Sequence, residues 1–134
     1  MSDRGNGVPE DLSSTLEKHH IWAATDGAQG EQADLRDLDL VGRSFWRADL
    51  RRALLDGCNL AGANLDHADL RGASLQGAKL ASASLWEAKL GKADLRGADL
   101  HDAKLDHADL RGADLRGANM DDVSLKSALL DDPG

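Results

Sequence analysis

The sequence predicts an all-β solenoid, a fold in which a short strand and a corner alternate until the chain forms stacked coils. Residues 33–132 divide into twenty pentapeptides in one unbroken register, and the central residue of each is Leu except at Phe45 and Met120. Glycine also recurs every twenty residues, at positions 57, 77, 97 and 117. The first residue of each pentapeptide is Ala in sixteen of the twenty, the exceptions being Leu38, Arg43, Cys58 and Val123.

The five-residue period excludes an amphipathic helix for this region. At about 100° per residue, successive Leu residues would lie about 140° apart around a helix axis, so no apolar stripe would form. Ala and Leu stand two positions apart within each repeat, which places both on one face of a strand. The other positions are mostly polar or Gly and suit an outer face and a turn. Such coils bury their apolar faces only by stacking.

The glycine spacing predicts coils of twenty residues, with boundaries at 33–52, 53–72, 73–92, 93–112 and 113–132. Glycine in a stacked corner can take the positive φ of a type II turn. A second column of corners carries larger side chains, which disfavour positive φ, so we expect a different turn there. That column consists of Arg47, His67, Glu87, His107 and Ser127.

The repeat A-(D/N/S/K)-L-x-x, seen in Ala93-Asp94-Leu95-Arg96-Gly97, resembles the A-(D/N)-L-x-x consensus of the pentapeptide repeat family over residues 33–132. The resemblance implies a right-handed quadrilateral β-helix with four pentapeptides per coil. The expected fold is therefore a β-helix of about five coils, preceded by an N-terminal α-helical cap.

The segment before the repeats predicts that cap. We expect residues 1–8 to be disordered and residues 9–32 to form the helical cap and its linker. Apolar residues fall at helical spacing from Leu12 to Ala23, and acidic residues stand at the start. Thr25-Asp26-Gly27 predicts the end of the helix. The segment also resembles the helical lead-in of many bacterial pentapeptide solenoids. We expect Leu12, Leu16 and Trp22 to face the core of the first coil.

The other end of the solenoid predicts self-association. After Leu130 only four residues remain, with 133–134 as a tail, and these are too few for a second helix. Open sheet edges favour association, and several members of the family dimerise through their C-terminal coils. We therefore expect a homodimer joined at this end, through the side chains of Leu115, Met120, Leu125, Leu129 and Leu130.

Charge and hydropathy limit the partners. The net charge is −8, of which residues 33–132 contribute −4, because they contain eighteen acidic and fourteen basic residues. This negative net charge disfavours direct binding of nucleic acid. The sequence contains no apolar stretch of about 20 residues, the length that a membrane-spanning helix needs. We also find no signal-peptide pattern at the N-terminus. We expect a cytoplasmic protein, in which the single Cys58 is a buried packing residue.

Outward residues supply the candidate contact surface. Trp46 and Trp86 lie forty residues apart and should stack on one face, alternating with Asp66 and Asp106. Exposed Trp often marks a protein contact. Beside this face, Val41 and two alanines (61 and 81) form a patch of low charge.

A metal site in the column of His67, Glu87 and His107 is disfavoured, because its two histidines would be about 9.6 Å apart at the backbone. Both histidines also belong to a nine-residue duplication, which explains their identity without selection for chemistry. We expect neither a metal nor another cofactor.

The sequence contains no catalytic grouping in a predicted pocket and no phosphate-binding loop. The leading hypothesis is a non-catalytic scaffold that presents a flat solenoid face to a protein partner. The alternative comes from the quinolone-resistance branch of the family, whose acidic dimeric solenoids resemble DNA and bind DNA gyrase or topoisomerase IV. Against it stand the low net charge of the solenoid and a basic column formed by Arg51, Arg71 and Arg111.

Overall fold

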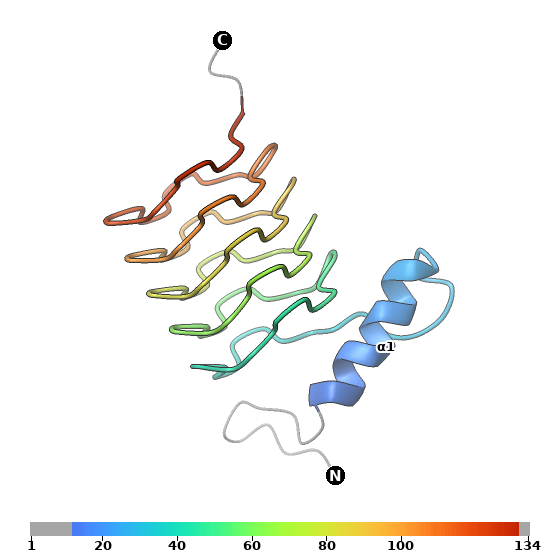
Figure 1. Cartoon of the computed structure of the whole chain (residues 1–134). Helices are drawn as coiled ribbons and strands as arrows, with labels where there is room; N and C mark the ends of the chain where they lie inside the picture. The colour runs from blue at the N-terminus through green and yellow to red at the C-terminus, as the bar shows by residue number, and fades with distance from the viewer. Residues whose placement is uncertain (1–11, 132–134) are drawn as a thin grey trace.

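The structure, a computed structural model, describes residues 12–131. One helix, α1 (Leu12–Ala24), is followed by a chain that winds into a stack of coils (Figure 1). α1 lies beside the first coil, at the end of the stack away from the C-terminal coil. The segment 1–8 that we expect to be disordered, the first residues of the expected cap (9–11) and the last three residues, including the 133–134 tail, lie outside the described range.

Parallel backbone bridges hold the coils together at a constant register of twenty residues. They run from Asp34 and Leu54 at one end to Asp109 and Leu129 at the other. Every bridge is an isolated one, so the described chain contains no strand longer than a single bridged residue. Two of every five residues form a corner, which leaves no room for a longer strand. We call residues 33–52, 53–72, 73–92, 93–112 and 113–131 coils 1 to 5.

The interior of the stack is a continuous core of Leu and Ala. The central Leu residues from Leu35 to Leu110 are at most 2% exposed, and Phe45 fits the same position at 1%. Leu38 and Cys58 occupy Ala positions and are also buried. Arg43, at a third such position, is exposed instead. The burial of each Leu depends on the coils above and below it, so the core is a property of the stack.

The corners share one backbone conformation, and this corrects one prediction. The glycines at 57, 77, 97 and 117 have φ between 66° and 75°, as expected. The column that we expected to turn differently also has positive φ, from 54° at Glu87 to 61° at His67 and His107. The backbone N–H of His67 donates to the carbonyl of Trp86 at 2.8 Å, so the hydrogen-bond ladder between coils imposes the turn. Each such residue stores strain of about 1–2 kcal/mol.

Helix α1 packs against coil 1 through its first two turns and its centre. Leu12 and Leu16 are partly buried against the core, and His19 is fully buried, at 0% exposure. Trp22, which we expected to face the core, instead stacks on the His19 ring at 5.4 Å and lies beneath the Arg52 guanidinium at 4.9 Å. Within residues 12–131, no helix has the length and apolar character that a bilayer span requires.

A glycine lets the chain return from α1 to coil 1. A Cβ on Gly30 would lie 2.3 Å from the carbonyl oxygen of Lys18 and 2.6 Å from the backbone nitrogen of Trp22. The next residue, Glu31, donates its N–H to the Lys18 carbonyl at 3.2 Å. Any side chain at position 30 would therefore push the linker off the helix.

Candidate interaction surfaces

Two tryptophans stand outside the solenoid, on one column of the stack. The exposed fraction is 56% for Trp46 and 41% for Trp86. The guanidinium of Arg47 lies 4.8 Å from the centre of the Trp46 ring. Trp86 is held between two histidine rings in edge contacts, with His67 at 5.2 Å and His107 at 5.7 Å. Both indoles are thus supported from the side while part of each remains open to a partner.

The aspartates that alternate with these tryptophans accept hydrogen bonds from the next coil. The Oδ1 atom of Asp66 accepts hydrogen bonds from the Ser84 hydroxyl at 2.5 Å and from the Trp86 backbone N–H at 2.9 Å. Asp106 accepts a short hydrogen bond from the Ser124 hydroxyl. An Asp followed by a Ser eighteen residues later is the sequence signal for this contact. Asp66 thus fixes the backbone at Trp86, and the hydrogen bonds of both carboxylates limit what they can offer to a partner.

The histidine column forms a structural contact. His67 Nδ1 lies 3.3 Å from the Glu87 carboxylate. A different group, missed by sequence reasoning, brings ligand atoms of His101, Asp102 and Asp122 within 4.8 Å of one another. His101 already faces both acids in this group, Asp102 at 3.0 Å and Asp122 at 4.0 Å, and all three side chains are at least 46% exposed. We interpret the group as a surface ion-pair cluster.

Six arginines pair with the aspartate two residues before them on the outer faces. In each pair Nε donates to Oδ1, and Nη2 donates to Oδ2 at 2.6–2.8 Å. The pairs are Arg36–Asp34, Arg51–Asp49, Arg71–Asp69, Arg96–Asp94, Arg111–Asp109 and Arg116–Asp114. The hydrogen bonds from Arg96 and Arg111 lower the pKa of Asp94 and Asp109 to about 2. These faces are therefore close to neutral.

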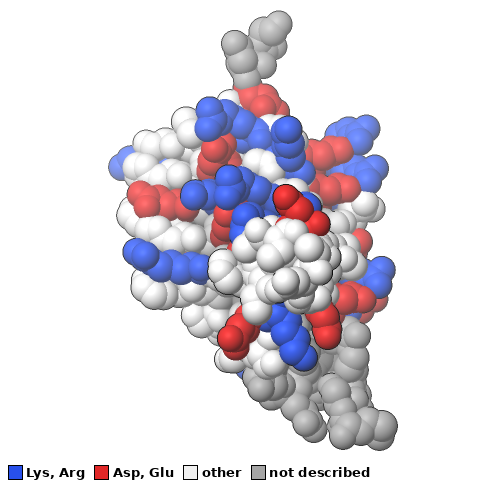
Figure 2. Space-filling view, turned by 90° about the vertical axis from the view of Figure 1, so that its right-hand side faces the viewer, with Lys and Arg blue, Asp and Glu red and all other residues white. Residues whose placement is uncertain are grey.

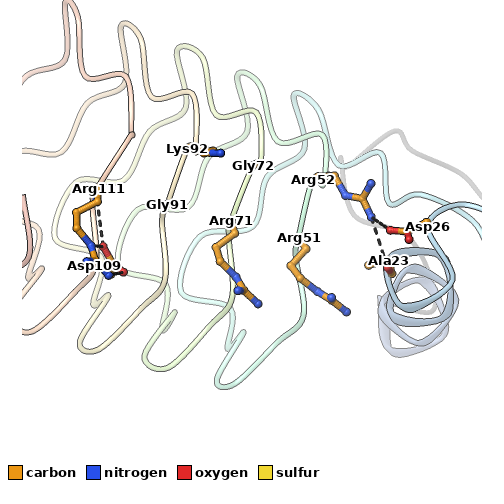
Figure 3. A pocket seen from close by; sticks show the side chains of 10 residues that line it. All are labelled: Ala23, Asp26, Arg51, Arg52, Arg71, Gly72, Gly91, Lys92, Asp109 and Arg111. Carbon is orange, nitrogen blue, oxygen red and sulfur yellow. Dashed lines mark hydrogen bonds and ion pairs between the residues drawn. The ribbon is translucent and has the colours of Figure 1, made fainter. Parts of the chain in front are cut away.

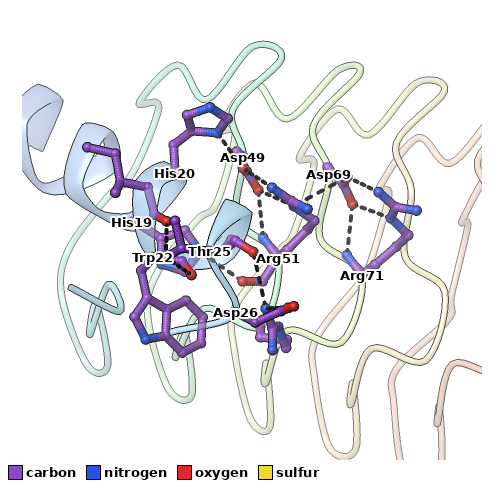
Figure 4. Close-up of polar contacts among 12 residues, drawn as sticks. His19, His20, Trp22, Thr25, Asp26, Asp49, Arg51, Asp69 and Arg71 are labelled. Atoms are coloured by element: carbon purple, nitrogen blue, oxygen red, sulfur yellow. Dashed lines mark hydrogen bonds and ion pairs between the residues drawn. The ribbon is translucent and has the colours of Figure 1, made fainter. Parts of the chain in front are cut away.

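Asp49 connects one of these pairs to α1. Its carboxylate contacts His20 Nδ1 at 2.6 Å as well as the Arg51 guanidinium (Figure 4). Burial alone would raise the pKa of Asp49, but the hydrogen bonds from Arg51 and His20 outweigh it and hold that pKa well below its usual range. Arg52 Nη2 also donates to the carbonyl of Ala23, in the last turn of α1, at 3.4 Å, and lies 3.5 Å from Asp26 just beyond the helix. The C-terminal half of α1 is therefore anchored by charge and hydrogen bonds.

The C-terminal coil is the open end of the stack. Leu129 and Leu130 are 49% and 51% exposed, and Leu115, Met120 and Leu125 are partly buried. In the coils before it, the N–H of each central Leu donates to a carbonyl of the next coil, as Leu100 does to Asn119 at 2.9 Å. Within residues 12–131, the corresponding N–H groups of coil 5 have no backbone acceptor. This end therefore presents both apolar side chains and unpaired peptide groups.

Comparison with known proteins gives the family. The family model for pentapeptide repeats matches residues 33–72, 58–97, 78–117 and 93–132, which together cover 33–132 without a gap. A search of curated proteins found no match to the chain.

Solved pentapeptide repeat proteins are similar to this chain. Rfr23 from the cyanobacterium Cyanothece 51142 is 36% identical, with a TM-score of 0.35, over 63% of this chain and 60% of that one. A protein from the Arabidopsis thaliana thylakoid lumen is 37% identical, with a TM-score of 0.43, over 69% and 61%. HetL from Nostoc sp. strain PCC 7120, involved in heterocyst differentiation regulation, is 32% identical, with a TM-score of 0.38, over 78% and 64%. The matches span less than two thirds of each of these structures.

The family model covers most of the chain, and the bridges of the structure repeat at the twenty-residue interval that four pentapeptides require. The chain therefore belongs to the pentapeptide repeat family.

Proposed function

We propose that this protein is a non-catalytic scaffold that presents one outer face of its solenoid to a protein partner and pairs with a second copy through coil 5. The observation that carries the proposal is the exposure of Trp46 and Trp86 on one column, above a core whose Leu side chains are buried. Tryptophan is enriched among residues that dominate binding energy in protein interfaces. Here both indoles project from rigid coils, so a partner would lose little free energy in ordering them.

The chemistry of the described residues supports a binding role over a catalytic one. Burial raises the pKa of the Cys58 thiol to about 12, which keeps it from acting as a nucleophile. The hydroxyls of Ser74, Ser84 and Ser124 donate to aspartates of the preceding coil and not to a histidine base. These groups stabilise the corners.

Pairing through coil 5 follows from the chemistry of an open edge. A second copy would cover Leu129 and Leu130 and would give the unpaired N–H and carbonyl groups hydrogen-bond partners. The other end of the stack carries α1, whose Leu12 and Leu16 pack against the core.

The partner-binding part of the proposal is tested by affinity capture with Trp46→Ser and Trp86→Ser combined in one variant. Capture from the native host is compared between the wild type, this variant, and a Val41→Ser control on the neighbouring face. The proposal expects a specific protein that is retained by the wild type and the control and lost with the double variant. Retention of the same proteins by all three would contradict a partner surface on the tryptophan column.

No feature of the described residues supports the DNA-mimicking alternative as the exposed tryptophans support the scaffold. A mimic of duplex DNA must present unneutralised negative charge at the spacing of phosphates. The aspartates at 49, 69 and 109 are instead bound by Arg51, Arg71 and Arg111. We therefore favour the scaffold, and the expected cytoplasmic location stays a prediction.

A further inference from the structure

A groove with a volume of about 720 Å³ lies between the C-terminal end of α1 and the neighbouring side of the solenoid (Figure 3). Ala23 and Asp26 line it at the helix end. Along its length it is lined by residues of coils 1 to 4, among them Arg51, Arg71 and Arg111, which recur at multiples of twenty residues. The groove is independent of the tryptophan column and of the open end at coil 5.

One break in the repeat lies within this groove. Positions 51, 71 and 111 are Arg, but position 91 is Gly91, and the preceding aspartate of that column is replaced by Lys89. A Cβ on Gly91 would meet the Arg71 Cγ at 3.8 Å and the Arg111 carbonyl oxygen at 3.5 Å, which is ordinary contact. The missing side chain therefore leaves a notch between two arginines, whose backbones are about 9.6 Å apart.

The lining is mixed in charge, with a small positive excess. Arg51, Arg52, Arg71, Lys92 and Arg111 line the groove together with Asp26 and Asp109. Asp49 and Asp69 are not among the lining residues but pair with Arg51 and Arg71, so five cations stand against four acids. Lysines and arginines lie close together on this side of the molecule, next to the end of α1 (Figure 2).

The cations of the groove retain unused donors. Asp109 takes two N–H groups of Arg111, at 2.9 and 2.8 Å. A guanidinium has five N–H donors, so Arg71 and Arg111 keep others after pairing with their aspartates. Lys92 has no ion-pair partner within residues 12–131.

We propose that the groove binds a small molecule carrying two or more phosphate groups, with one phosphate in the notch at Gly91 between Arg71, Lys92 and Arg111. Guanidinium and ammonium groups are the usual protein ligands of phosphate oxygens. Because the cations extend over four coils, from Arg51 to Arg111, they span about 14 Å and suit several linked anions. The groove volume is that of a small-molecule site.

A duplex nucleic acid is a poorer fit to the same groove. The whole chain has a net charge of −8, and acids alternate with the bases on this side. α1 stands at one end of the groove and would obstruct a long rod that continued past it. A short oligophosphate meets neither obstacle.

The test is isothermal titration of the full-length protein with inorganic tripolyphosphate at low salt. Two variants remove the site. Gly91→Glu places an acid in the notch, and Lys92→Gly removes a cation at a corner where Gly72 and Gly112 occupy the same column. Two controls make the same charge changes on other faces, Ala81→Glu and Lys104→Ala. Circular dichroism and thermal unfolding establish that each variant is folded.

Saturable binding to the wild type is expected, weakened at least about tenfold by each site variant and changed less than about twofold by each control. Orthophosphate is expected to bind at least about tenfold more weakly than tripolyphosphate, because it engages fewer cations. No binding at millimolar tripolyphosphate, or equal losses in site and control variants, would overturn the proposal. Equal affinity for orthophosphate would overturn the requirement for several phosphates, and tighter binding of duplex DNA would overturn the small-molecule assignment.

Discussion

The Nδ1 atom of His19 accepts a hydrogen bond from the backbone N–H of Ala33 at 2.9 Å. On the other side of the ring, Nε2 lies 2.8 Å from the Arg51 carbonyl oxygen and must donate to it. A neutral imidazole protonated on Nε2 satisfies both contacts, whereas a proton on Nδ1 would face the Ala33 N–H. One buried side chain of α1 therefore connects the beginning of coil 1 to its end.

This contact predicts that stability falls as pH is lowered from 7 to 5. Burial lowers the pKa of His19 from its usual 6.5, against the opposing effect of the Arg51 carbonyl. Below pH 6.5 the unfolded chain therefore binds a proton at His19 that the folded chain resists, so the free energy of unfolding decreases as pH falls. Urea titrations at several pH values between 7 and 5 measure the free energy of unfolding. Asp94 and Asp109 do not interfere, because their lowered pKa values place their contribution below about pH 4.

The matched variant is His19→Gln, whose amide can donate to one carbonyl and accept from one N–H without titrating. We expect it to flatten the change of stability between pH 7 and 5. His107→Gln, at an exposed position, should leave the change as in the wild type. An undiminished pH dependence in His19→Gln would assign the effect to another group.

Leu95→Ala should lower the free energy of unfolding by about 2–5 kcal/mol, because Leu95 is 1% exposed and its loss leaves a cavity between rigid coils. Leu129→Ala, at a position that is 49% exposed, should cost less than about 1 kcal/mol in the monomer. Chemical denaturation at low protein concentration gives both values. Similar costs at the two positions would argue against a filled interior.

Cys58 should resist thiol reagents in the folded protein. It is fully buried, and burial raises its pKa to about 12, so almost no thiolate is present at neutral pH. Reaction with a chromogenic disulfide should proceed only after denaturant is added. Rapid labelling of the native protein would show that the core opens at coil 2.

A gyrase supercoiling assay separates the scaffold from the DNA mimic. At micromolar protein, with and without a fluoroquinolone, we expect neither inhibition of supercoiling nor protection from the drug. The reason is the neutralisation of outer aspartates by Arg51, Arg71 and Arg111. Protection at that concentration would favour the alternative function.

The repeat itself made most of the fold predictable. The spacing of the central Leu residues and of the small residues two positions before them predicts which side chains point into the core. The twenty-residue spacing of the glycines predicts the length of a coil. The positive φ of Glu87 and His107 was not predictable in the same way, because intrinsic preference disfavours it and the hydrogen bonds of the next coil impose it.

Surface features that involve α1 were harder to predict. The helix lies outside the repeat, so no periodicity specifies its contacts, and Trp22 beneath Arg52 depends on how the linker at Gly30 places it. The notch at Gly91 does have a sequence signal, since a twenty-residue alignment shows Gly where Arg71 and Arg111 stand. Its meaning depends on the neighbouring helix, which closes one end of the groove.

The pairing of two copies through coil 5 is tested most directly by sedimentation velocity at micromolar concentration. The chain mass is 14.2 kDa. We predict a species of twice that mass for the wild type, and the mass of a single chain for the Leu129→Glu, Leu130→Glu double variant, whose carboxylates would be buried at the interface. A wild type that sediments as a single chain at every concentration would contradict the account, as would a double variant that remains paired.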